Sequence, residues 1–175
     1  MGYTHYWEFK KPKKGTADKT EKTYQSAIKE CARIVKAYYA VNGGLSGFTA
    51  HTPIGKYGGL QVNGKGDDAH EEFSLREHYR QNFEGDVFDR YTFCKTARKP
   101  YDIVVVACLI VLKHRLKDLI VVSSDGYSDD WKEGLRLAKN VLKLKTLSIP
   151  KTIREYQGPT ATQLPRFQKL TLVKG

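Results

Sequence analysis

The amino-acid sequence predicts a single α+β domain that has a mixed or mostly antiparallel sheet and about three main helices. The chain has 175 residues, a length typical of one domain with its own hydrophobic core. Its apolar residues alternate in some segments and recur at helical spacings in others. The resulting order is strand, helix, several strands, helix, strand and helix. This order lacks the regular alternation of a doubly wound fold, so it favours α+β over α/β.

The N-terminal part of the chain has the clearest patterns. The stretch GYTHYWEF, residues 2–9, is dense in aromatic residues and alternates, which is typical of a strand. One face of this strand carries Tyr3, His5 and Trp7, and the other carries Thr4, Tyr6 and Glu8. After a polar loop, apolar residues recur at spacings of three and four from Thr20 until Asn42, where two glycines follow. This pattern predicts an amphipathic helix.

The middle of the chain is rich in glycine and turn residues. Between Gly43 and Asp68, short alternating pieces such as FTAHTP and YGGLQVNG indicate hairpins or a long flexible loop. The segment HEEFSL, residues 70–75, is a candidate strand, and EHYRQNFEGD, residues 77–86, is predicted to be a loop with a helical turn.

The second half of the chain holds the most apolar segments. VFDRYTFCKTA, residues 87–97, is predicted to be a strand, and a buried helix follows from Pro100 to about Leu116. IVVSSDG, residues 120–126, is predicted to be an apolar strand. Ser128 then opens an amphipathic helix that has two aspartates in its first turn.

Residues 1–148 are predicted to form the domain, and residues 149–175 a C-terminal extension. Prolines and glycines interrupt the extension, and its apolar residues have no helical period. We expect it to wrap the domain or to pair with a neighbouring chain in a homo-oligomer.

The composition favours an anionic partner. Thirty Lys and Arg residues against 19 Asp and Glu give a net charge of +11, which suits nucleic acid, nucleotides or phosphates. The three cysteines form no CxxC pair, so the sequence indicates neither a disulfide framework nor a zinc site. The longest apolar run, Ile103 to Leu112, is shorter than the roughly 20 residues that span a bilayer. We therefore expect a cytoplasmic protein without a membrane partner.

The motif FCKTARKPYD, residues 93–102, places three cations just before a predicted helix start. A helix N-terminus carries a partial positive charge, so cations are mildly repelled there. One interpretation is an anion site, in which Lys95, Thr96 and Arg98 close around a phosphate bound by free backbone N–H groups. The other is that Asp102 satisfies the helix dipole while the cations point into water.

Three further segments contain candidate ligand-binding residues, each with a plain structural alternative. In SSDG, Ser124 and Asp125 could meet a ribose hydroxyl or form an ordinary turn. His70 lies among four carboxylates, yet no second histidine stands at a metal-ligand spacing, so no metal is expected. A stacking surface for a base could be formed by His5, Tyr6 and Trp7, although aromatic residues in a first strand are often core.

Together these segments resemble a family of small, mostly uncharacterised proteins of bacteriophages and other mobile elements. The resemblance covers about residues 1–145 and rests on MGYTHYW, NG followed by AHEEF, FCKTARKPYD before an apolar helix, and SSDG followed by DDW. It implies that motif residues converge on one pocket, namely His5, Tyr6, His70, Lys95, Thr96, Arg98 and Asp125. It also implies a role in opposing host defence.

Three functions are compatible with these observations. The first is an anti-defence protein that sequesters a small phosphorylated nucleotide signal, such as a cyclic nucleotide or an ADP-ribose derivative, without a cofactor. The second is a metal-independent phosphodiesterase, with His5 and His70 as acid and base and Lys95 stabilising negative charge. The third is a nucleic-acid-binding protein that uses the positive charge of the chain, although its cations gather in no recognisable motif.

Overall fold

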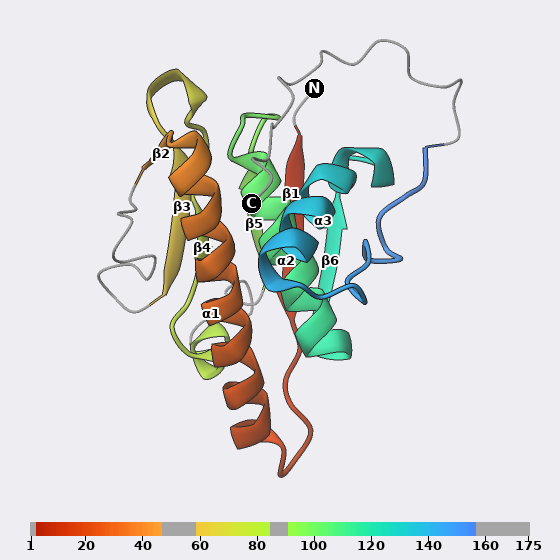
Figure 1. Ribbon diagram of the computed structural model, residues 1–175. Helices are drawn as coiled ribbons and strands as arrows, with labels where there is room; N and C mark the ends of the chain where they lie inside the picture. Colours follow the sequence, from red (N-terminus) through yellow and green to blue (C-terminus); the bar gives the residue numbers. More distant parts are fainter. Residues whose placement is uncertain (1–2, 47–58, 85–90, 157–175) are drawn as a thin grey trace.

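The computed structural model describes residues 3–46, 59–84 and 91–156 of the chain. Within these residues, the helices and two small antiparallel sheets build an α+β fold, as the sequence predicted (Figure 1). No helix in these ranges combines the length and the apolar character needed to cross a membrane.

The larger sheet has three strands in the order β5-β1-β6. Strand β1 (Thr4–Phe9) lies in the centre and pairs antiparallel with both β5 (Tyr91–Lys95) and β6 (Ile120–Ser124). The predicted alternation of β1 is confirmed, because His5, Trp7 and Phe9 are buried while Tyr6 and Glu8 between them are partly exposed. One face of the sheet therefore belongs to the core.

The smaller sheet consists of β2 (Leu45–Ser46), β3 (Leu60–Gly64) and β4 (Phe73–Leu75), again antiparallel. These strands confirm the hairpin predicted around LQVNG and the strand predicted in HEEFSL. The predicted piece FTAHTP lies outside the described residues. Short 3-10 turns complete this region, among them η1 (Gly66–Asp68) and η2 (Tyr79–Phe83), where a helical turn was predicted.

The described part of the chain has three long helices: α1 (Ala17–Asn42), which lies over the smaller sheet, and α2 (Asp102–Leu116) and α3 (Ser128–Leu142), which lie over the larger sheet (Figure 1). Helix α2 lies against the sheet with α1 on one side and α3 on the other (Figure 1). Every side chain from Val104 to Leu112 is consequently buried. A short 3-10 turn, η4 (Lys117–Leu119), leads from α2 into β6.

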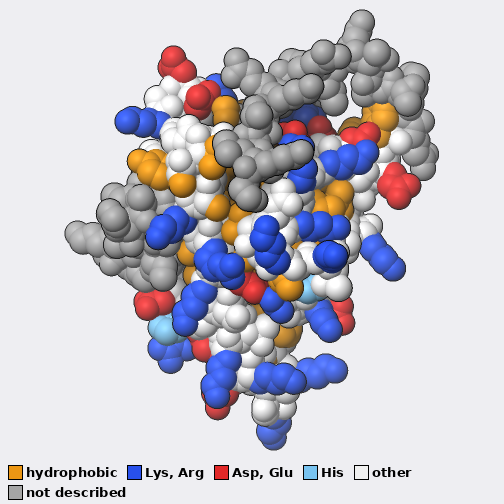
Figure 2. Space-filling view, viewed as in Figure 1, with side chains coloured by type: hydrophobic (Ala, Val, Ile, Leu, Met, Phe, Trp, Pro, Cys, Tyr) orange, Lys and Arg blue, Asp and Glu red, His pale blue; other side chains and the backbone are white. Residues whose placement is uncertain are grey.

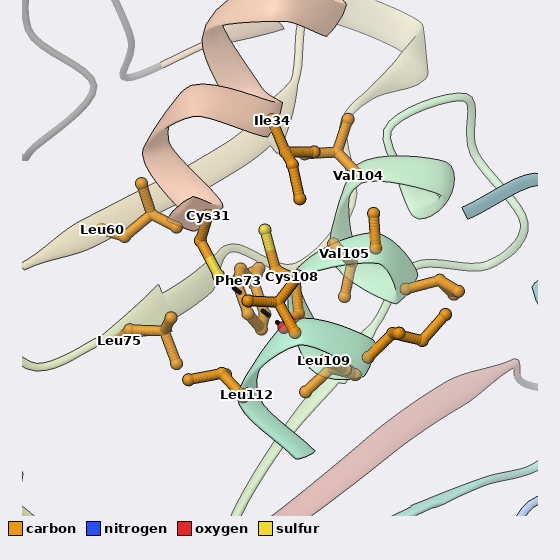
Figure 3. Close-up of a cluster of buried hydrophobic side chains, with 14 of the residues drawn as sticks. Cys31, Ile34, Leu60, Phe73, Leu75, Val104, Val105, Cys108, Leu109 and Leu112 are labelled. Atoms are coloured by element: carbon orange, nitrogen blue, oxygen red, sulfur yellow. Dashed lines mark hydrogen bonds between the residues drawn. The ribbon is translucent and has the colours of Figure 1, made fainter. Parts of the chain in front are cut away.

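The main core lies where α1 and α2 meet the smaller sheet (Figure 3). Helix α1 contributes Cys31 and Ile34, helix α2 contributes Val104, Val105, Cys108, Leu109 and Leu112, and the smaller sheet contributes Leu60, Phe73 and Leu75. Burying apolar surface stabilises a fold by roughly 25 cal/mol per Å², so this interface is a main source of stability.

One boundary differs from the sequence-based prediction. Helix α2 begins at Asp102 rather than at Pro100, because two consecutive turns come first, with Lys99 N–H bound to the Thr96 carbonyl and Asp102 N–H bound to the Lys99 carbonyl. The described part of the predicted extension, residues 149–156, lies against the domain. Ile153 is buried there, and residues 157–175 lie outside the described part.

Helix α3 approaches α2 most closely at Gly134. A Cβ atom added there would lie 2.5 Å from Cγ1 of Val106 and 3.0 Å from the backbone nitrogen of Ala107. We expect Gly134→Ala to lower the free energy of unfolding by about 1–3 kcal/mol through overpacking, even though alanine favours a helix by about 1 kcal/mol over glycine. Urea unfolding followed by circular dichroism measures the change.

The matched control is Asn140→Ala, an exposed position in the same helix, which should change stability by less than about 0.5 kcal/mol. If both variants were as stable as the wild type, the close approach of α2 and α3 would be contradicted.

The three cysteines are buried and unpaired. Burial raises the pKa of the Cys94 thiol to about 12 and that of Cys31 well above its ordinary value. Because the thiolate is the reactive form, we expect a thiol reagent such as DTNB to modify these two cysteines at pH 8 at least tenfold more slowly in the native protein than in urea, as an order-of-magnitude estimate. Fast reaction of the native protein would contradict this burial.

Candidate functional site

The predicted site residues gather around one end of the larger sheet, the upper end in Figure 1. Strand β1 begins there, strands β5 and β6 end there, and helices α2 and α3 start nearby because each follows one of these strands after a short loop. The carboxyl ends of strands, next to helix starts, are common ligand sites in open sheets. The contacts of each residue decide what this end of the sheet can bind.

The side chain of Asp102 joins β1, β5 and α2. One of its oxygens, Oδ1, lies 2.7 Å from Nε2 of His5 and accepts a hydrogen bond of 2.5 Å from the hydroxyl of Thr96. His5 and Thr96 are both fully buried. Asp102 also stands in the first turn of α2, where a carboxylate is favoured by the helix dipole. His5 and Thr96 therefore bind a carboxylate of the protein itself.

Arg98 is held by a second carboxylate. Its Nη1 lies 2.5 Å from Oδ1 of Asp130, in the first turn of α3, and its guanidinium lies 4.0 Å from the ring centroid of Tyr3. Ala97 and Arg98 both have positive φ, at 50° and 60°, a conformation that is uncommon for residues other than glycine. The turn is thus shaped so that Arg98 reaches Asp130.

These contacts give the cations before α2 a different explanation from the predicted anion site. Thr96 points inward to Asp102, and Arg98 pairs with Asp130. Lys99 donates to the carbonyl of Asp67 over 2.6 Å. The structure therefore does not close Lys95, Thr96 and Arg98 around one point, because Thr96 and Arg98 bind different carboxylates of the protein, Asp102 and Asp130.

The segment that contains His70 lies beside the same motif. Glu71 runs along the outer edge of β5, where its carboxylate accepts from Lys95 N–H over 2.7 Å and its carbonyl accepts from the Tyr101 hydroxyl over 2.6 Å. His70 itself is exposed, and only its backbone is held, by the side chain of Asn63. Among the described residues, no group of three or more His, Cys, Asp or Glu side chains is placed to hold a metal ion.

The register of the sheet separates the residues of the predicted phosphodiesterase. His5 stands opposite Cys94 and faces the helices, whereas Lys95 stands opposite Thr4 and belongs to the other face. An acid, a base and a cation must converge on one phosphorus to cleave a phosphodiester. His5 and Lys95 do not converge in this structure.

The side of the larger sheet turned away from α2 is called the outer face below. It is formed by alternate residues of the three strands: Thr4, Tyr6, Glu8, Tyr91, Phe93, Lys95, Val121 and Ser123. Tyr91 is 51% exposed and Phe93 54% exposed. Of the five large hydrophobic side chains exposed in the described part, three lie on this face: Tyr91, Phe93 and Val121. Most of the large apolar side chains that are exposed in the described part therefore gather on this face.

Three aromatic rings lie side by side on the outer face. The ring of Tyr6, in the central strand, is stacked with that of Tyr91 at 6.0 Å between centroids and 23° between planes. The ring of Phe93 is 6.5 Å from Tyr6. Trp7 belongs to the opposite face, where it is buried against Phe73. Of the predicted aromatic candidates, Tyr6 is therefore available to a ligand and Trp7 is core.

Ser124 and Asp125 stand at the corner between the sheet end and the outer face. The Ser124 hydroxyl accepts from Gly126 N–H over 3.0 Å, which is the ordinary turn that the sequence left open. Asp125 is exposed, and its Oδ2 accepts from Thr4 N–H over 3.1 Å. The Tyr6 hydroxyl is 3.4 Å from each oxygen of this carboxylate. Asp125 thus keeps acceptor capacity beside the aromatic rings.

Behind the turn of Arg98 lies a closed aromatic cluster. The ring of His5 packs edge-on between Tyr3, at 5.0 Å, and Trp131, at 5.3 Å. Burial, followed by the charge of Asp102, raises the pKa of the Tyr3 phenol, so this hydroxyl stays protonated. Polar atoms of these three rings are shielded from solvent. The cluster supports the sheet end and presents no open surface to a ligand.

Sequence reasoning missed Tyr91 and Phe93 as site residues. A signal was present, because Tyr91, Phe93 and Lys95 alternate with Thr92 and Cys94 in the strand predicted over 87–97. Alternation alone does not tell which face of a strand meets the core. The pairing of β5 with β1 answers that question.

Comparison of the chain with protein-family models, with curated proteins and with solved structures finds no match. The resemblance to phage and mobile-element proteins therefore stays a prediction.

The role of Asp102 can be tested by removing its carboxylate. Asp102→Ala leaves His5 and Thr96 buried without their partner, and each unsatisfied group costs about 1–3 kcal/mol. We expect the free energy of unfolding to fall by about 2–5 kcal/mol in urea titrations.

Asp18→Ala is the matched control, because Asp18 is an exposed aspartate in the first turn of α1. It should lose only the helix-dipole contribution of about 0.3–1 kcal/mol. Equal losses in the two variants would show that the buried contacts of Asp102 contribute little.

Proposed function

We propose that this protein binds nucleotides by stacking nucleobases on the outer face of its larger sheet, and that it acts by binding rather than by catalysis. The observation that carries the proposal is the group of three neighbouring rings, Tyr6, Tyr91 and Phe93, two of which are more than half exposed. Stacking of a base on an aromatic side chain contributes about 1–3 kcal/mol, and every base has a face that can stack.

Polar residues around the rings suit the rest of a nucleotide. Lys95 lies on the same side of β5 as Tyr91 and Phe93, so its ammonium can meet a phosphate. Asp125, next to Tyr6, can accept a hydrogen bond from a ribose hydroxyl. The net charge of +11 adds a general attraction for anions. Tyr6, Lys95 and Asp125 thus keep the roles that the sequence predicted for them.

Binding is favoured over cleavage because no acid and base face a common point on the outer face. His5 points into the opposite side of the sheet, where it binds Asp102. The carboxylates near the rings, Glu8 and Asp125, have no histidine partner among the contacts described for them.

The outer face suits any ligand in which a nucleobase is joined to a phosphate. Two sources supply it: a small nucleotide signal, which the family resemblance implies, and a nucleic acid, which the charge of the chain suits. Sequestration of a host signal stays a prediction under this proposal.

The double variant Tyr91→Ala/Phe93→Ala tests the site. We expect it to lose at least about tenfold in affinity for a panel of 3′,5′-cyclic AMP, a cyclic dinucleotide, ADP-ribose and octauridylate, in which at least one member binds the wild type, since each ring contributes about 1–3 kcal/mol. Intrinsic tyrosine fluorescence or ligand-observed NMR reports binding. Chromatography after denaturation should return the ligand intact.

Arg98→Ala is the control that separates the outer face from the anion site predicted before α2. Arg98 binds Asp130 and lies off the outer face, so this variant should bind nucleotides as the wild type does. Loss of binding in Arg98→Ala, with binding kept in the double variant, would reject the proposal and support the anion site instead.

A further inference from the structure

We infer that the ligand of the outer face is a single-stranded nucleic acid, whose successive bases stack along β5, rather than a free nucleotide. This inference rests on the proposed function and specifies the class of ligand. It follows from the openness of the face, from the spacing of its rings and from the distribution of charge around it.

The outer face is too open for tight capture of one small molecule. Sites for small ligands are concave and usually bury 70–90% or more of the ligand, as a rough survey range. A single nucleotide stacked on Tyr91 or Phe93 would keep its other face in water, because these side chains are 51% and 54% exposed on a sheet surface. A polymer compensates for such shallow contacts by repeating them along the strand.

The hollows described on the surface lie elsewhere. One of about 530 Å³ is lined by residues of the 11–21 segment and of η2, including Lys11, Glu21 and Tyr79. Another of about 660 Å³ is lined by residues of α1 and by Arg115. Neither includes an outer-face residue, so the aromatic group is a platform rather than the wall of either hollow.

The rings are spaced for consecutive bases. Tyr91 and Phe93 are two residues apart on the same side of β5, which places their attachment points about 6.6–6.8 Å apart along the strand. Tyr6 stands opposite Phe93 on β1, and the centroid of its ring is 6.0 Å from that of Tyr91 and 6.5 Å from that of Phe93. A sheet that presents aromatic side chains on neighbouring strands is a recurrent platform for two or three unpaired bases.

The charges around the platform suit a sugar-phosphate backbone. Lys95 and Lys10 stand near opposite ends of the strand pair. The carboxylate of Glu8 is 2.6 Å from the ammonium of Lys10, so its repulsion for phosphate is reduced. Asp125 is a second acidic residue beside the rings, and it can accept a hydrogen bond from a ribose hydroxyl of the bound strand.

Cations elsewhere on the molecule add long-range attraction. Figure 2 shows Lys and Arg side chains spread over the face that the helices form. Exposed cations of α1 and α3 include Lys29, Arg33, Lys36, Lys132 and Arg136, and the exposed Lys143 follows α3. A polyanion gains more from this field than a mononucleotide does, because each phosphate of a strand adds to the attraction.

A length series of oligonucleotides tests the inference. Fluorescence anisotropy is measured with labelled oligouridylate and oligothymidylate of about two, four, eight and twelve nucleotides, because single-strand-binding domains contact roughly 4–16 nucleotides. Uridine monophosphate and 3′,5′-cyclic AMP serve as unlabelled competitors, and a twelve-base-pair duplex as a further ligand. We expect affinity to rise at least about tenfold from two to eight nucleotides, and the duplex to bind more weakly than the single strand of equal length.

The variant Tyr91→Ala/Phe93→Ala should weaken octanucleotide binding at least about tenfold, whereas Tyr156→Ala should leave it within about twofold. Tyr156 is a matched control because it is an aromatic residue, 42% exposed, that packs on Tyr127 rather than on the outer face. Far-UV circular dichroism confirms that the variants fold, which is expected because the substituted side chains are exposed.

The possible outcomes separate the two proposals. Tight binding of a free nucleotide with no gain from length, lost in the double variant, would overturn the single-strand inference and leave the proposed function standing. Binding that the double variant retains, or duplex binding as strong as single-strand binding, would overturn both, since it would place binding on the helical cations. Absence of binding to every nucleotide and oligonucleotide would also overturn both.

Discussion

Most of helix α2 is buried, and the other elements are placed so that they cover it. Side chains from Val104 to Leu112 have no face in contact with water. The sheet, α1 and α3 each bury part of its surface, and Gly134 lets α3 approach closely. Because the hydrophobic effect is proportional to apolar area and has no direction, a helix that is apolar on all sides must be enclosed on all sides.

Burial of its apolar side chains does not determine at which residue α2 starts. A polar contact of Asp102 fixes the start of the helix. Asp102 fixes the first turn of α2 to His5 of the central strand and to Thr96 at the end of β5. The carboxylate and its partners are mostly buried, so a missing member would leave polar groups unsatisfied. Because His5 and Thr96 bind Asp102, these two side chains at the end of the sheet are not available to bind an anionic ligand.

The central strand β1 separates structure from proposed function by its alternation. His5 and Trp7 face the helices and belong to the core. Tyr6 faces the other way and joins Tyr91 and Phe93 in a group of rings that the described residues leave partly open. A sheet covered by helices on one face only has a second face available for binding, and aromatic side chains make that face suitable for flat ligands. The nucleotide-binding proposal follows from this asymmetry.

The sequence by itself determined the fold class, because its signals are local. The period of α1, the alternation of β1 and the apolar run of α2 each lie within one segment, and each predicts its element without knowledge of the neighbours. It also placed Tyr6 and Trp7 on opposite faces of one strand. The sequence predicted the ends of the elements less accurately than their type, since α2 begins at Asp102 and not at Pro100.

Only the tertiary structure decided which of the candidate residues are free to bind a ligand. Asp102 stands 97 positions from His5, and Asp130 stands 32 positions from Arg98, so no local pattern in the sequence predicts these contacts. Tyr91 and Phe93 become a surface group because β5 pairs with β1 in a particular register. Contacts between segments distant in the chain depend on the whole packing arrangement, and for that reason Arg98 is paired within the protein while the rings of β5 remain exposed.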